Sequence, residues 1–153
     1  MPSQILHTLF GEDLISAMYR SLVPRFGPAA DKALEKIRGS CRTAFALGCQ
    51  GPDIFYHSQG RRPVGLEYGT LLHRRGAGVF TAGLLKMGLP GPAPDGEDIR
   101  RRERGIDALG AYALGFMTHA ILDRAAHPYI IYKSDHHAFF ERIIDVLMLR
   151  DLR

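Results

Sequence analysis

Histidine and carboxylate residues recur at four-residue intervals in the last third of the chain. His119, Asp123 and His127 follow one another in this way, and His137 precedes Glu141 by the same interval. On an α-helix, residues four apart lie on one face, about one turn from each other. Imidazole nitrogen and carboxylate oxygen are the donors that zinc and similar ions bind, with an open position left for water. The spacing therefore predicts a metal site built on two helices.

The central pair, His119 and Asp123, lies within an otherwise apolar stretch, YALGFMTHAILDRAAH. Burying a lone carboxylate among such residues is costly unless it is paired or binds a metal ion. A hydrogen-bonded His–Asp pair between helices would meet this need without an ion, so the spacing leaves both interpretations open. Bound ions would activate water, and two of them roughly 3.5–4 Å apart can clamp the attacking and leaving oxygens of a phosphoryl transfer.

Further candidate ligands are spread over the first half of the chain. His7 precedes the first expected helix, and His73 lies in an apolar helical stretch. Asp53 directly follows a Gly-Pro pair, where a turn is the ordinary role of an aspartate. His57 is surrounded by Ser, Gln, Gly and Arg residues, so we expect it to be exposed.

The composition is that of one ordinary globular domain. The chain has 153 residues, of which 46% are hydrophobic and 24% charged, which excludes a disordered chain. Two cysteines are too few for a disulfide scaffold, so Cys41 and Cys49 are expected to be reduced. The net charge of +4 favours anionic ligands without specifying one. No signal peptide and no run of about 18 apolar residues is visible, which predicts a cytoplasmic protein.

Apolar residues recur with the period of helices, and no segment shows the alternation typical of a strand. The sequence therefore predicts an all-α multi-helix bundle, as a single domain over residues 1–153. Gly11 is expected to delay the first helix to about residue 12, and Pro24, Gly27 and Pro28 are expected to break it. Residues 51–65 hold too many helix breakers for a regular element, and residues 88–105 are expected to form a loop rich in Pro, Gly and Arg. Further helices are expected over residues 31–38, 40–47, 66–87, 106–126 and 136–149.

Six motifs follow one another along the chain: HTLFG at 7–11, LGCQGPDIF at 47–55, LH at 72–73, GFMTHAILD at 115–123, HP at 127–128 and HxxxE at 137–141. In this order they resemble the zinc-dependent phospholipase C family, especially its bacterial members without secretion signals. The resemblance covers roughly residues 4–149 and implies an all-α fold related to P1-type nucleases. The chain is short for that family, and its helical pattern still runs at VLMLRDLR, as expected of a bundle truncated at its C-terminus.

The resemblance also implies two or three zinc ions and a role for each candidate ligand. One ion would be held by Asp53, His73, His119 and Asp123. A second would be held by His127, His137 and Glu141. A third would be held by His7 and Asp123, with Asp123 bridging two ions. Asp53 would also orient or deprotonate the attacking water.

Together these observations predict a zinc-dependent phosphoester hydrolase, in which metal-activated water attacks a phosphodiester such as a phospholipid. Transient contact with a membrane surface would accompany a lipid substrate, and Phe55, Tyr56, Tyr129 and Tyr132 are the candidates for contacting it. No aromatic residues alternate with a basic groove, which argues against nucleic acid. The alternative is a catalytically inactive helical module that binds metal or a partner, because a fold does not by itself carry an activity.

Overall fold

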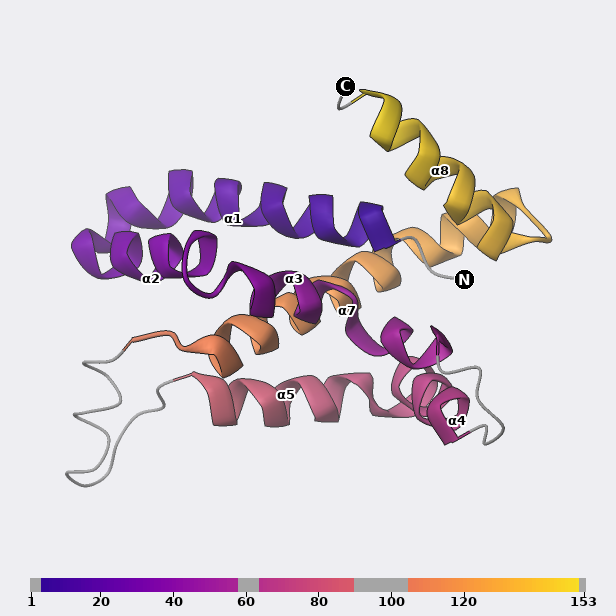
Figure 1. Cartoon of the computed structure of the whole chain (residues 1–153), viewed down its shortest axis with the longest axis horizontal. Coiled ribbons are helices and arrows are strands. Elements are labelled where there is room, and N and C mark those ends of the chain that lie inside the picture. The colour runs from indigo at the N-terminus through magenta and orange to yellow at the C-terminus, as the bar shows by residue number, and fades with distance from the viewer. Residues whose placement is uncertain (1–3, 58–63, 90–104, 152–153) are drawn as a thin grey trace.

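The computed structural model describes residues 4–57, 64–89 and 105–151, except for the side chains of residues 137 and 138, and its regular elements there are all helices (Figure 1). The all-α prediction is therefore confirmed over the described part of the chain. Most of the loop expected over residues 88–105 lies outside it. The elements are α1 (Gln4–Phe26), α2 (Pro28–Arg38), α3 (Arg42–Cys49), the 3-10 helix η1 (Gly51–His57), α4 (Val64–Leu71), the π-helix η2 (Leu72–Gly76), α5 (Ala77–Gly88), α7 (Ala108–Lys133) and α8 (His137–Asp151).

The long helix α7 lies at the centre of the arrangement and packs against both α3 and α5 (Figure 1). Its start is capped by Asp107, whose side chain accepts a hydrogen bond from the backbone N–H of Gly110. One buried apolar cluster joins α7 to α1, α2 and α3, and a smaller cluster joins it to α5. The first consists of Ile15, Leu34, Ile37, Cys41, Phe45, Cys49 and Ala111, and the second of Leu84, Ala113 and Phe116.

Helices α3 and α7 approach each other through two facing glycines. A Cβ atom on Gly48 would lie 2.2 Å from the backbone oxygen of Tyr112, and one on Gly115 would lie 2.2 Å from that of Phe45. Neither contact could be relieved by rotating a side chain, because backbone atoms are the obstacle. The glycines thus allow the end of α3 to lie directly beside the middle of α7, where His119 is found.

The first helix differs from the expectation. α1 begins at Gln4 and continues through Gly11, so the predicted start near residue 12 is wrong. It continues through Pro24 but ends at Phe26, so the predicted break falls at Gly27 and Pro28. Gly11 is buried against α3, where a Cβ atom would lie 2.5 Å from the Cys49 Sγ, and this packing offsets the roughly 1 kcal/mol that a glycine costs in a helix. As a result His7, expected before the helix, is a buried residue within it.

Two other boundaries also differ from the expectation. Residues 51–57, expected to be irregular, form the 3-10 helix η1, which carries Asp53. α7 does not stop near residue 126 but continues through Pro128 to Lys133, so it carries His127 as well as His119 and Asp123. The helical stretch expected over residues 66–87 is confirmed as α4, η2 and α5 in succession, and His73 lies in the π-helical part.

Candidate metal centre

A pocket of about 1070 Å³ opens beside the middle of α7. Its histidine and carboxylate lining comes from α1, η1, η2, α7 and α8, so segments far apart in the sequence meet there. Seven of the eight ligands predicted from the sequence line this pocket: His7, Asp53, His73, His119, Asp123, His127 and Glu141. The eighth, His137, is the first residue of α8, and its side chain lies outside the described part of the structure.

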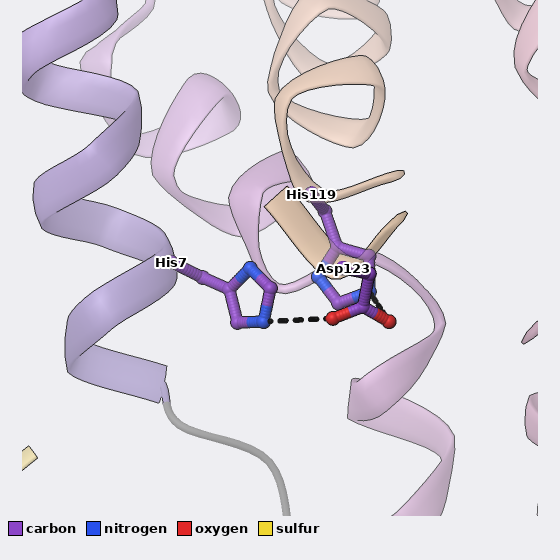
Figure 2. Close-up of side chains that lie close together, drawn as sticks. All are labelled: His7, His119 and Asp123. Atoms are coloured by element: carbon purple, nitrogen blue, oxygen red, sulfur yellow. Dashed lines mark ion pairs between the residues drawn. The ribbon is translucent and has the colours of Figure 1, made fainter. Parts of the chain in front are cut away.

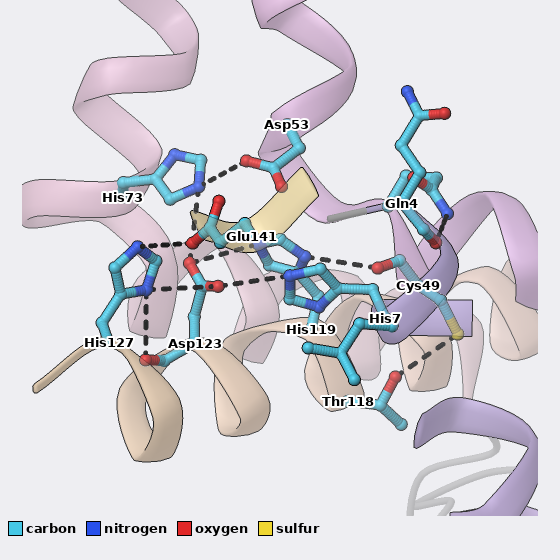
Figure 3. Close-up of polar contacts among 12 residues, drawn as sticks. Gln4, His7, Cys49, Asp53, His73, Thr118, His119, Asp123, His127 and Glu141 are labelled. Atoms are coloured by element: carbon cyan, nitrogen blue, oxygen red, sulfur yellow. Dashed lines mark hydrogen bonds and ion pairs between the residues drawn. The ribbon is translucent and has the colours of Figure 1, made fainter. Parts of the chain in front are cut away.

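Asp123 is the point on which four of the histidines converge (Figure 3). The Nε2 atom of His7 lies 3.3 Å from its Oδ1, and the rings of His7 and His119 stack with 4.1 Å between their centroids (Figure 2). The Nε2 atoms of His119 and His73 each lie 3.5 Å from the other carboxylate oxygen, Oδ2. The Nδ1 atom of His127 lies 3.4 Å from Oδ1. Each oxygen of the Asp123 carboxylate thus faces two imidazoles.

Asp53 extends the cluster on one side and Glu141 on another. Asp53 is buried, with 4% of its surface exposed, and its Oδ1 lies 2.9 Å from the Nε2 of His73. Glu141 comes from α8 and is 7% exposed, with its Oε1 3.6 Å from the Nε2 of His127. Carboxylates as buried as these need cationic partners, and the partner beside each is a histidine.

Backbone carbonyls fix the orientation of two histidine rings. The Nδ1 of His119 lies 3.2 Å from the carbonyl oxygen of Cys49, and the Nδ1 of His73 lies 2.7 Å from that of Gly69. A carbonyl oxygen only accepts hydrogen bonds, so each Nδ1 carries a hydrogen and donates it. In the neutral ring the lone pair is then on Nε2, the atom that faces the carboxylates. This arrangement is typical of metal-binding histidines.

Two buried imidazole nitrogens have no hydrogen-bond partner among the described residues: Nδ1 of His7 and Nε2 of His119. The His119 Nε2 lies near the Asp123 carboxylate, but 3.5 Å is too long for a good hydrogen bond. A nitrogen lone pair and a carboxylate oxygen that face each other repel, and a cation between them would attract both. The donor set of imidazole nitrogens and carboxylate oxygens fits a borderline divalent cation such as zinc in that place.

The donor atoms form two groups compact enough to hold an ion. His7, His119 and Asp123 make one group, and Asp53, His73 and His119 make the other. In each group, one ligand atom from every residue lies within 4.8 Å of the others. His119 belongs to both, so the two groups adjoin one another.

Three side chains in this cluster, Asp123, His127 and His73, have shifted pKa values. Burial would raise the pKa of Asp123, but the surrounding imidazoles of His119, His127 and His7 outweigh burial and hold the pKa of that carboxyl well below its usual range. The hydrogen bond to Asp123 raises the pKa of His127 to about 9 despite its burial. Burial lowers the pKa of His73, but its bonds to Asp53 and the Gly69 carbonyl raise the pKa above the usual value overall. A divalent ion that binds to these imidazoles would displace the protons on the coordinating nitrogens.

Gly51 lies directly against the ring of His119. Its φ angle is +53°, in the left-handed region that favours glycine, and a Cβ atom there would lie 2.3 Å from the His119 ring. The glycine therefore allows the backbone to turn into η1 and leaves room for the ring of His119.

The other residues singled out from the sequence fall at and around this pocket. Tyr56 lines it, with its hydroxyl 3.4 Å from the Nδ1 of His73, whereas Phe55, Tyr129 and Tyr132 are not among the lining residues. His57 is exposed, as expected. Cys41 and Cys49 are free thiols, also as expected, and both are buried.

Sequence reasoning missed two arginines and two carbonyls. Arg74 and Arg124 line the pocket, and each directly follows a candidate ligand in the sequence. Adjacent residues on a helix point about 100° apart, so this position alone does not indicate that they line the same pocket. The carbonyls of Cys49 and Gly69 leave no signal in the sequence, because every residue has one.

Comparisons with protein-family models, with curated proteins and with solved structures find no match for this chain. Within the described residues, none of the helices has the length and apolar character required to span a membrane. The function of the pocket must therefore follow from its own residues and their geometry.

Proposed function

We propose that the protein is a zinc-dependent phosphoester hydrolase of the phospholipase C and P1 nuclease type. The observation that carries the proposal is the convergence of His7, His73, His119 and His127 on the single carboxylate of Asp123 within a large open pocket. A purely structural Asp–His pair needs one histidine for one aspartate, and it needs no pocket. Four imidazoles around one carboxylate are more than helix packing requires.

The proposed ligand sets follow the proximity of the donor atoms. Asp53, His73 and His119 form one compact group, which Asp123 completes because its Oδ2 lies 3.5 Å from both imidazoles. His7 and Asp123 belong to the adjoining group. His127 and Glu141 lie 3.6 Å apart and supply the remaining set, which His137 completes in the proposal.

Zinc ions bound to these residues would supply an activated water and offset the negative charge of a phosphoryl group. The protein's own contribution is to position those ions and to handle the proton. Asp53 is the residue proposed to accept the proton of the attacking water, because it lines the pocket as a buried carboxylate. The Cys49 and Gly69 carbonyls hold His119 and His73 in the orientation that directs Nε2 toward the ions.

The remaining lining supports a phosphodiester with an apolar portion, such as a phospholipid. Leu66, Phe116 and Ile131 line the same pocket as the ligand residues. Tyr129 and Tyr132 lie outside it on α7, 60% and 81% exposed, with the ammonium group of Lys133 near both rings. Exposed tyrosines beside a lysine suit contact with a lipid surface, which is where such a substrate would be met.

The test is metal content together with hydrolysis. Protein purified without chelator or affinity-tag metal is expected to hold about two zinc ions per chain by plasma mass spectrometry, and to hydrolyse bis(para-nitrophenyl) phosphate. Asp123→Asn removes the bridging charge and should lose most of the zinc and the activity. Asp13→Asn, an exposed aspartate on α1, makes the same chemical change away from the pocket and is the matched control. Substoichiometric metal that added zinc does not restore would instead identify an inactive helical module.

A further inference from the structure

We infer that the pocket takes a phosphoester carrying a second anionic group, and that Arg74 and Arg124 bind this group. The inference rests on the proposed function, because it names the class of substrate for the same pocket. It assigns two residues that lie outside the proposed ligand sets.

The two arginines reach the pocket from different elements. Arg74 lies in the π-helix η2, directly after His73, and Arg124 lies in α7, directly after Asp123. Both line the pocket, and both are exposed to solvent. Because both side chains line the same pocket as His73 and Asp123, they border the place where the phosphate would sit.

Both arginines are without a partner in the part of the chain that the structure describes. Among the residues that the structure describes, Arg74 and Arg124 form no ion pair, hydrogen bond or ring contact. The arginines of the smaller pocket beside α1 and α3 differ, because Arg42 pairs with Glu12 at 2.8 Å and Arg38 donates to Ser16 at 3.0 Å. The large pocket thus combines an open volume with two uncommitted guanidinium groups, which can each form two parallel hydrogen bonds with a phosphate or carboxylate.

The charges around the pocket determine which second substituent of a phosphodiester, here called the substrate arm, the pocket favours. The carboxylates in its lining are Asp53, Asp123 and Glu141, and all three belong to the proposed ligand sets. Two zinc ions would more than neutralise these three negative charges, so the charges left in the described lining are positive and include those of Arg74 and Arg124. No described carboxylate in the lining remains to attract a cationic arm, whereas an anionic arm meets two positive charges.

The first experiment varies only the charge of the substrate arm. Four para-nitrophenyl phosphodiesters share one leaving group and differ in the second arm, which is choline, its neutral isostere tert-butylethyl, carboxypropyl or phosphonopropyl. We expect kcat/KM for the two anionic arms to exceed that for the neutral arm, and kcat/KM for the choline arm to fall below it. The carboxypropyl and phosphonopropyl esters then distinguish a carboxylate from a phosphate-like group as the preferred anion.

The second experiment removes the guanidinium groups. Arg74→Gln and Arg124→Gln should each lower kcat/KM for the preferred anionic arm by about tenfold, as expected for a lost charge-assisted hydrogen bond. The decrease in kcat/KM for the neutral arm should be smaller. The ratio of kcat/KM for the anionic arm to that for the neutral arm should therefore fall in each variant and approach one in the double variant. Arg75→Gln is the matched control, because Arg75 is the exposed neighbour of Arg74 and does not line the pocket. Zinc content and circular dichroism report whether each variant keeps its site and fold.

Binding separates this inference from the proposed function. Inorganic pyrophosphate, titrated calorimetrically into zinc-loaded protein, should bind about tenfold more weakly to Arg74→Gln and to Arg124→Gln than to wild type or Arg75→Gln. That result without hydrolysis of any ester would support the anion site and overturn the hydrolase. Hydrolysis with equal rates for all arms, and with pyrophosphate affinity the same in all variants, would support the hydrolase and overturn the anion site.

Discussion

The carboxylate of Asp145 in α8 accepts a hydrogen bond from the backbone N–H of Leu6 at the start of α1, with 2.9 Å between Oδ1 and N. Its other oxygen lies 3.4 Å from the N–H of Ile5. The first N–H groups of a helix have no partner within it, so a side chain from α8 caps α1. His7 follows directly on α1 and Glu141 lies one turn earlier on α8, so this contact holds two edges of the metal centre together.

Replacing the cap should therefore affect both stability and metal binding. Asp145→Ala is expected to lower the free energy of unfolding by about 1 kcal/mol, measured by urea denaturation. Zinc affinity should fall about tenfold, because His7 and Glu141 lose a shared support. Asp151→Ala, at the exposed end of the same helix, is the control and should change neither quantity. Equal effects of the two substitutions would show that Asp145 does not hold α8 in place.

Substitution of Asp53 tests whether this residue is a catalytic carboxylate or only a turn residue. Asp53→Asn keeps the size of the side chain but removes the proton acceptor, so hydrolysis should fall by about 100-fold or more. The fold should be retained, with thermal unfolding close to that of wild type. Asp13→Asn again provides the matched control on an exposed aspartate. If Asp53→Asn hydrolyses the ester at the wild-type rate, Asp53 only shapes η1.

Gly51 offers a test of how tightly the ring of His119 is held. Gly51→Ala places a Cβ atom 2.3 Å from that ring at a φ angle of +53°, and should cost roughly 1–3 kcal/mol of stability and weaken zinc binding. Gly78→Ala makes the same change in α5, where nothing lies within 4 Å of the new atom, and should instead stabilise the protein by about 0.4–1 kcal/mol. The two variants can be compared by urea denaturation and zinc titration. Equal stability of both would mean that His119 yields to the added atom.

The thiol of Cys49 predicts a pH dependence. Burial raises the pKa of this thiol above its ordinary value of 9.0, although a hydrogen bond with Thr118 opposes the shift. The folded thiol thus stays protonated where the unfolded thiol ionises, so its contribution to stability is complete below pH 9.0 and declines as the pH rises further. The difference in unfolding free energy between wild type and Cys49→Ala should therefore shrink between about pH 7 and about pH 10. Urea denaturation with reductant measures it, and a constant difference would contradict the prediction.

The sequence predicted most of the helices and most of the residues of the candidate metal centre. His119, Asp123 and His127 do lie along one face of α7, because helical geometry alone brings residues four apart together. Asp53, His73 and Glu141 join them in one pocket, as the order of motifs led us to expect. Helical periodicity and residue type carried the first of these predictions, and the resemblance carried the second.

Tertiary packing accounts for what was missed. Gly11 was expected to interrupt α1, but it is buried against Cys49, and this contact could not be inferred from the residues near it in the sequence. His7 was therefore placed before the helix rather than inside it. Arg74 and Arg124 were not predicted as site residues, because only the folded chain shows that they border the same pocket. Each of these errors arose where a long-range contact outweighed a local preference.

Backbone carbonyls, rather than side chains, hold the rings of His119 and His73 in place. A point substitution can delete a side chain, but it leaves the carbonyl of residue 49 or 69 present. The orientation of these two rings therefore cannot be lost by substituting residue 49 or 69 alone, but it can be lost by substitutions that move the backbone. A larger residue at Gly48 or Gly115 would separate α3 from α7 and carry the Cys49 carbonyl away from His119, with every metal-binding side chain still encoded. Variation at such helix contacts can alter metal affinity gradually, in a way that substitution of the ligands themselves cannot.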